Sequence, residues 1–171
     1  MQFHRPALLD PNEHRRDEFT CGETVLDDWL RRYAGQNRRG NTAAVWVITD
    51  ANQTVVCYAT LSMTSIDRSA SPASLGKGAP RQIPALLIGR LATDTRVAGL
   101  GLGTEMVKHI LATAAELNIK AACRALVVTA MNADAFRWWQ RFGFEQFNAD
   151  DANNMDVYLL TTDIAETLVN L

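Results

Sequence analysis

The residues best suited to chemistry lie in a glycine-rich segment in the second half of the chain. From Arg96 to Thr104 the sequence reads Arg-Val-Ala-Gly-Leu-Gly-Leu-Gly-Thr, after an apolar run and directly before a stretch with helical periodicity. The three glycines allow successive backbone amides to point in one direction, and the helix that follows adds the positive end of its dipole. The segment predicts a binding site for an anion such as a pyrophosphate.

The spacing of these glycines separates several classes of phosphate loop. A Walker A loop ends in Gly-Lys-Ser/Thr, whereas this one ends in Gly103-Thr-Glu. A Rossmann fingerprint requires an acidic residue about twenty positions later, outside the helix, but Glu116 falls within the helical pattern. The remaining match, Arg-x-x-Gly-x-Gly starting at Arg96, resembles the acetyl-CoA loop of the GNAT family of N-acetyltransferases. Taken alone, the motif also fits an ordinary turn between a strand and a helix.

A second segment supports the same resemblance. Residues 132–144, Asn-Ala-Asp-Ala-Phe-Arg-Trp-Trp-Gln-Arg-Phe-Gly-Phe, follow a strand-like run and predict a short helix that ends at a glycine. The segment resembles the family's Asn-x-x-Ala-x-x-x-Tyr pattern through Asn132, Ala135 and the Phe-Gly-Phe ending. Two motifs in the family's order make this a strong resemblance.

The first half of the chain narrows the resemblance to the tRNA-acetylating toxins of bacterial toxin–antitoxin pairs. The matching residues are Phe19-x-Cys-Gly22, Leu26, Asp28, Trp29, Leu30, Arg81-Gln-Ile-Pro84 and Leu87-Ile-Gly-Arg-Leu-Ala92. The resemblance implies transfer of an acetyl group from acetyl-CoA to the amino acid of a charged tRNA, which stops translation. It also implies a ribbon-helix-helix antitoxin as partner, and it allows for a homodimer.

The resemblance implies a set of cofactor contacts. The end of the strand before the loop should align the pantetheine arm, and Arg96 with the amides after it should hold the pyrophosphate. Asn132 and Ala135 should border the far side of the cofactor. The full expected set is Leu91, Ala92, Thr93, Arg96, Val97, Ala98, Gly99, Leu100, Gly101, Leu102, Gly103, Thr104, Asn132, Ala135 and Trp139.

The sequence departs from the family pattern at Trp139, where the family carries a tyrosine that commonly serves as general acid near the coenzyme sulfur. Indole cannot protonate a thiolate, although its N–H can donate a hydrogen bond. Packing is an equally good interpretation of this tryptophan. Tyr158, in the strand-like run 155–160, is the candidate catalytic residue in its place; a strand tyrosine without a catalytic role is the alternative.

Composition limits the remaining choices. The chain has 171 residues, 47% of them hydrophobic, and a net charge of −2, so we expect one domain, 1–171, with a sizeable core. Cys21, Cys57 and Cys123 lack disulfide or metal-ligand spacing, and we expect no metal. Without a signal peptide or an apolar run of about 18 residues, we expect a cytoplasmic protein that does not bind membranes.

A tRNA-binding protein is expected to carry basic surface, yet the sequence pI is near 5.9. Arginines nevertheless gather in the first quarter of the chain. Four of them are the candidates for tRNA contact: Arg31, Arg32, Arg38 and Arg39. A solvated helix face neutralised by nearby acidic residues is the alternative.

Hydrophobic periodicity predicts an α/β fold with a mixed, mostly antiparallel central sheet flanked by helices, as the GNAT resemblance also implies. A short strand is expected at the start. Further strands are expected at 42–48, 55–62, 85–93, 125–130 and 155–160, with a turn at 50–53. Helices are expected at about 23–33, 103–117 and after Asn132, and a long loop at 64–82.

Three functions fit these observations. The first is a toxin-like acetyltransferase acting on aminoacyl-tRNA. The second is an acetyltransferase for a protein or small-molecule amine, which would use the same cofactor motifs. The third is an acetyl-CoA-binding protein with impaired catalysis, because Trp139 stands where the family has its acid.

Overall fold

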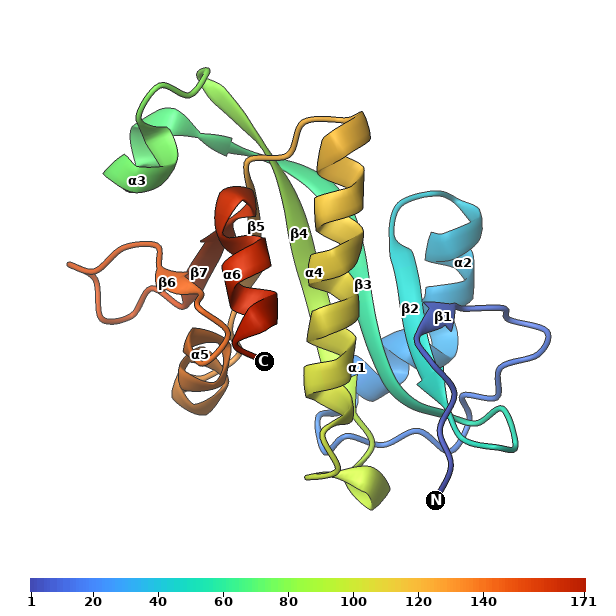
Figure 1. Ribbon diagram of the computed structural model, residues 1–171. Coiled ribbons are helices and arrows are strands. Elements are labelled where there is room, and N and C mark those ends of the chain that lie inside the picture. The colour runs from blue at the N-terminus through green and yellow to red at the C-terminus, as the bar shows by residue number, and fades with distance from the viewer. The chain divides into compact units, whose positions relative to one another are not determined.

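The computed structural model describes residues 1–171 (Figure 1). The chain divides into two compact units. The first unit comprises Met1–Ser62 and Gly89–Ile110, and the second comprises Met63–Ile88 and Leu111–Leu171. Hydrogen bonds order seven strands as β1-β2-β3-β4-β5-β7-β6. The β4–β5 pair is parallel, whereas β1–β2, β2–β3, β5–β7 and β6–β7 are antiparallel. This topology confirms the predicted fold class.

The first unit is built on an antiparallel hairpin. Its elements are β1 (Ala7–Leu8), α1 (Thr24–Asp28), α2 (Ala34–Arg39), β2 (Ala44–Thr49), the first part of β3 (Val55–Asp67), the end of β4 (Gln82–Thr93), a 3-10 turn (Thr95–Val97) and the start of α4 (Leu102–Lys120). The predicted turn closes β2 onto β3: the Asp50 carboxylate accepts from the amides of Asn52 and Thr54, and Gln53 has a φ of 60°. The predicted hairpin is confirmed.

The predicted helix at 23–33 is longer than expected and contains a π-helical turn, Trp29–Tyr33, between α1 and α2. Trp29 and Leu30 are buried, whereas Tyr33 is 50% exposed. A π-helical turn holds one residue more than an α-helical turn. The buried face therefore continues at Ala34, which is fully buried with Leu30 in the core of this unit.

The second unit holds the parallel strand pair. Its elements are the end of β3, α3 (Ala73–Gly76), the start of β4, the rest of α4, β5 (Ala125–Thr129), α5 (Ala133–Gln140), β6 (Glu145–Gln146), β7 (Asp156–Leu160) and α6 (Ile164–Val169), with 3-10 turns at Arg68–Ala70 and Thr161–Asp163. β4 and β5 pair from Ala85↔Ala125 to Leu87↔Val127.

The prediction of one long loop at 64–82 was wrong at both ends and in the middle. β3 continues to Asp67, α3 interrupts the segment, and β4 already begins at Gln82. Leu75 and Ala79 explain why this segment has regular structure, because they pack into a buried cluster with Ile83 and other residues. Such tertiary anchoring cannot be inferred from Ser, Pro and Gly content.

Helix α4 has one buried stripe of apolar side chains. Met106, Val107, Ile110, Leu111 and Ala114 are all fully buried, which gives the helix one apolar face. It starts one residue before the predicted range and ends three residues after it, at Lys120. None of the helices has the length and apolar character needed to cross a membrane.

Candidate functional site

The glycine-rich loop lies between the end of β4 and the first turn of α4. Gly99 and Gly101 have φ values of +79° and +83°, a region that side-chain-bearing residues rarely adopt. A Cβ added to either glycine would meet no atom within 4 Å. These two glycines are therefore needed for the backbone conformation of the loop, and the space next to their Cα atoms is open.

The first turn of α4, directly after these glycines, has amides without a backbone partner. The first i→i−4 bond of the helix runs from the amide of Glu105 to the carbonyl of Gly101, at 3.0 Å. The amides of Leu102, Gly103 and Thr104 precede it, and N-terminal amides of a helix have no partner inside the helix. Together with the helix dipole they form an environment that stabilises an anion. The geometry fits the pyrophosphate of a coenzyme A.

Arg96 is held by protein carboxylates. Its Nε and Nη2 donate to the two oxygens of Asp94 at 2.9 and 2.8 Å, and its Nη1 lies 3.4 Å from Glu18. Hydrogen bonding to Asp94 raises the pKa of Arg96. The arginine side chain is still 47% exposed. Arg96 thus fixes the entrance of the loop, and only its outward side remains for a phosphate.

Asp94 is the residue of this loop that sequence reasoning missed. Its carboxylate is fully buried and also accepts from the amides of Thr20 and Arg96. Burial raises the pKa of Asp94, but the hydrogen bonds from Arg96 and Thr20 outweigh it and the net shift is downward. An aspartate two residues before an arginine, at the end of a strand, was the available signal.

The strand residues before the loop lie close to its start within the first unit. Ala92 is buried in the core of this unit, while Leu91 and Thr93 are half-buried. Thr93 Oγ1 lies 3.5 Å from Cys57 Sγ, which is itself 3.9 Å from the carbonyl of Leu102. These contacts join β3 and β4 to the first turn of α4. Burial raises the pKa of Cys57 to about 12, so its thiol is inert.

The second motif forms α5 in the second unit. Asn132 caps this helix, its side-chain oxygen accepting from the amide of Ala135 at 2.9 Å. Gly143 follows the helix with a φ of +82°, as the C-terminal glycine predicted. The side-chain oxygen of Asn132 therefore has a structural task in addition to any contact with a cofactor.

Trp139 lies inside an aromatic cluster. The side chain is 5% exposed, and its ring packs edge-to-face on Trp138 and Phe144, with centroids 5.0 and 5.1 Å apart. Phe142 completes the cluster at 6.2 Å. The indole fills space in the core, whatever else it contacts.

Tyr158 is buried in β7, 3% exposed. Its hydroxyl donates to Glu145 at 3.0 Å and makes a short hydrogen bond with Ser74. Burial and the carboxylate of Glu145 raise the pKa of Tyr158, so the phenol is protonated at neutral pH. Both of its hydrogen-bonding partners are protein groups, which gives the hydroxyl a structural role.

The four candidate tRNA-binding arginines differ in how free they are. Arg31 donates to the carbonyl of Phe19 and lies 4.0 Å from Asp28. Arg38 is half-buried, whereas Arg32 and Arg39 are exposed. The last two are therefore the best placed to meet an external phosphate.

Cys21 is no candidate nucleophile. Burial and the side chain of Asp27 raise its pKa to about 11, so almost no thiolate exists at neutral pH.

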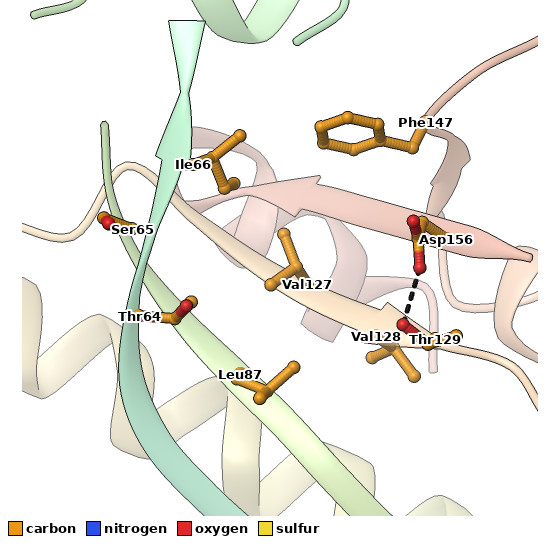
Figure 2. A pocket seen from close by; sticks show the side chains of 9 residues that line it. All are labelled: Thr64, Ser65, Ile66, Leu87, Val127, Val128, Thr129, Phe147 and Asp156. Carbon is orange, nitrogen blue, oxygen red and sulfur yellow. Dashed lines mark hydrogen bonds between the residues drawn. The ribbon is translucent and has the colours of Figure 1, made fainter. Parts of the chain in front are cut away.

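The second unit also contains a pocket of about 190 Å³, which sequence reasoning did not single out (Figure 2). It lies where the parallel pairing of β4 and β5 ends, at Leu87 and Val127. Ile66 and Phe147 provide further apolar surface, and Asp156 provides a carboxylate. Tyr158 does not line it. Ligands commonly bind beyond the carboxyl ends of parallel strands, so this is a natural place for a substrate.

Known proteins resemble this chain over most of its length. A curated relative, the "tRNA-acetylating toxin" of Mycobacterium tuberculosis (strain ATCC 25618 / H37Rv), is 28% identical over 127 residues, covering 74% of this chain and 76% of that protein. The structure of AtaT complexed with acetyl-methionyl-tRNAfMet is similar with a TM-score of 0.86, at 23% identity, covering 96% of this chain and 98% of that one.

A tyrosine-to-phenylalanine mutant of the AtaT toxin, bound to the C-terminus of the antitoxin AtaR and acetyl-CoA, matches with a TM-score of 0.82 at 22% identity, covering 96% of both chains. At these identities the solved structures establish a shared fold. The family itself is established by sequence, because the pattern of the "Acetyltransferase (GNAT) family" matches residues 9–144. This chain belongs to the GNAT family of acetyltransferases.

Proposed function

We propose that this protein transfers the acetyl group of acetyl-CoA to the α-amino group of an aminoacyl-tRNA, and so acts as a translation-inhibiting toxin. The single observation that carries the proposal is the loop from Arg96 to Thr104, with two glycines at positive φ directly before the unpaired amides of the first turn of α4. The names of the relatives supply the acceptor: one is a tRNA-acetylating toxin, and the AtaT structure holds acetyl-methionyl-tRNA.

The proposed chemistry is compatible with Trp139 in place of the family's acid. In the transfer the neutral amine nitrogen bonds to the thioester carbonyl carbon, the carbon–sulfur bond breaks with coenzyme A leaving as its thiolate, and the amine's proton passes to solvent or to that thiolate. An α-amine has a reference pKa of about 7.7–8.0 and a thiol one of about 8.5, so both groups are close to their reactive forms at neutral pH. Positioning of the two reactants can supply much of the rate.

The loop's part in this chemistry is to hold the coenzyme. Backbone amides and a helix dipole bind a pyrophosphate without a side chain, which leaves Arg96 free to hold the loop through Asp94. Leu91 and Thr93, at the end of β4, would present backbone groups to the pantetheine arm. Asn132, Ala135 and Trp139 remain proposed coenzyme contacts.

The proposal also implies binding partners and a cellular compartment for this protein. A charged tRNA is met in the cytoplasm, where translation takes place, so the protein would act there. Arg32 and Arg39 are the proposed phosphate contacts. A ribbon-helix-helix antitoxin is the proposed protein partner, in keeping with the AtaT toxin bound to the C-terminus of its antitoxin.

The test is acetyl transfer from labelled acetyl-CoA to total charged tRNA, with deacylated tRNA, a lysine-containing peptide and spermidine as parallel acceptors. We expect label in the aminoacyl group after nuclease digestion and none in deacylated tRNA. Label in the peptide or polyamine alone would replace the proposal by the second function. Coenzyme binding without transfer to any acceptor would favour a protein with impaired catalysis.

A further inference from the structure

The pocket of the second unit suggests which acceptors this enzyme takes. We propose that it receives the aminoacyl group of the charged tRNA, with the side chain against its apolar wall and the α-amino group at Asp156. This group arrives as an ammonium and loses a proton to water before the neutral nitrogen attacks the thioester. The preferred substrates are then aminoacyl-tRNAs with an uncharged apolar side chain of medium size. This inference rests on the proposed function and adds the identity of the amino acid to it.

The location of the pocket suits an acceptor. β4 and β5 pair in parallel as far as Leu87↔Val127, and the pocket lies at that last pair (Figure 2). Val127 and Thr129 lie on one face of β5 because side chains alternate along a strand. Asp156 of β7 pairs with Thr129, so its side chain emerges on that same face. The carboxylate and the apolar wall therefore belong to one surface.

The apolar wall has a defined shape. Ile66 from β3, Leu87 from β4, Val127 from β5 and Phe147 surround the cavity in Figure 2. Phe147 packs edge-to-face against Tyr158, with ring centroids 6.0 Å apart. At about 190 Å³ the pocket is smaller than the roughly 300–1,000 Å³ of a pocket for a drug-sized ligand. It has the capacity of one side chain.

The polar side of the pocket carries one fixed charge. Asp156 Oδ1 accepts from Thr129 Oγ1 at 2.5 Å, and its Oδ2 lies 3.4 Å from Asn154 Nδ2. No lysine or arginine lines the pocket. The carboxylate therefore attracts the ammonium of an incoming aminoacyl group and repels an acidic side chain.

An aminoacyl group matches this arrangement because its ammonium and its side chain stem from one carbon atom. With the ammonium at Asp156, the side chain is directed to the wall formed by Leu87, Val127 and Phe147. A charged side chain would lose hydration against that wall without gaining a partner. Glycine would leave the wall uncovered.

The test uses one tRNA charged by an aminoacylating ribozyme with methionine, leucine, glycine, aspartate or lysine, so that only the amino acid differs. We expect kcat/KM for the methionyl and leucyl forms to exceed that for the glycyl, aspartyl and lysyl forms by about tenfold or more. Equal values for all five would overturn the inference while the proposed function stands. Acetylation of none of them would overturn both.

Two variants test whether the preference for certain amino acids arises in the pocket. Leu87→Ala enlarges the cavity and should shift the preference about tenfold toward the phenylalanyl form relative to the leucyl form. Leu86→Ala is the matched control, because Leu86 is a buried neighbour on the opposite face of β4. It should cost stability without moving that ratio. The same ratio shift in both variants, or in neither, would contradict the inference.

Asp156 is tested as a positioning residue. Asp156→Asn keeps the shape and can still accept from Thr129, so we expect KM for every aminoacyl-tRNA to rise about tenfold with little change in kcat. Asp151→Asn, an exposed acid in the loop before β7, is the control that should change neither constant. An unchanged KM in Asp156→Asn would contradict the proposed contact between Asp156 and the α-amino group.

Discussion

The glycine-rich loop and the helix α5 carry the two segments that resemble the family's motifs, and they use their residues in opposite ways. In the loop, Gly99 and Gly101 contribute no side chain, and the space a Cβ would enter is empty. In α5, Trp139 contributes a large side chain that is almost completely buried among other rings. The first motif works through the backbone, and the second through packing.

This difference explains why the loop depends on its residue types and why position 139 can hold another residue. A backbone conformation at positive φ depends on glycine itself. A packed position depends on volume and shape, so a second aromatic residue can occupy it provided that its neighbours adjust. The loss of the family's tyrosine is therefore structurally mild, whatever it does to the proton transfer.

The largest effect is expected in the aromatic cluster. Trp139→Ala should lower the free energy of unfolding by about 3–5 kcal/mol, because it leaves a cavity between Trp138 and Phe144. Urea denaturation measures this cost. Trp139→Tyr is the companion variant: it keeps most of the packing and supplies a phenol, so its single-turnover rate should equal or exceed that of the unaltered protein. A loss below about 1 kcal/mol for Trp139→Ala would show that the ring is not a core residue.

The loop should respond in ligand affinity as well as in stability. Gly101→Val should weaken coenzyme A binding by about 10- to 100-fold, since a β-branched residue at positive φ costs on the order of 1–3 kcal/mol and its Cβ enters the space of the phosphate. Calorimetric titration measures the affinity. Gly78→Val is the matched control, with a φ of +71° and no atom near its Cβ, but outside the loop. An affinity that falls equally in both variants would assign the loss to general strain.

Features determined by neighbouring residues could be predicted from the sequence, whereas features that depend on distant segments could not. The loop was predictable because three closely spaced glycines before a helical pattern indicate its backbone conformation without reference to distant residues. The role of Asp94 was not, because its partners include the amide of Thr20, 74 residues away. Likewise Tyr158 could be assigned to a strand, but its bonds to Ser74 and Glu145 depend on segments 84 and 13 residues distant. The spacing of apolar residues around Trp29 does not indicate a π-helical turn.

Tyr158 tests whether a packed residue can also be catalytic. The hydroxyl is engaged with Glu145, so Tyr158→Phe should cost about 1–2 kcal/mol of stability and leave the single-turnover rate within a few-fold. Glu145→Gln, which keeps an acceptor for the hydroxyl, should cost less. A hundredfold fall in the chemical step of Tyr158→Phe, with unchanged coenzyme binding and melting temperature, would instead make Tyr158 the general acid.

The smallest effect is expected where neither backbone nor packing defines the site. Arg32 and Arg39 are exposed, so their interactions with phosphate would be screened by salt. Reversing both to glutamate should weaken tRNA binding several-fold at physiological salt and reduce the slope of log K against log salt by about one unit for each arginine–phosphate ion pair removed. The double variant Lys120→Glu/Arg141→Glu makes the same change of net charge with exposed residues of the second unit. If both pairs flatten the slope equally, the tRNA responds to total charge and not to a site; if only the first pair does, the basic residues around α2 form a tRNA-binding surface that the acidic average of the chain conceals.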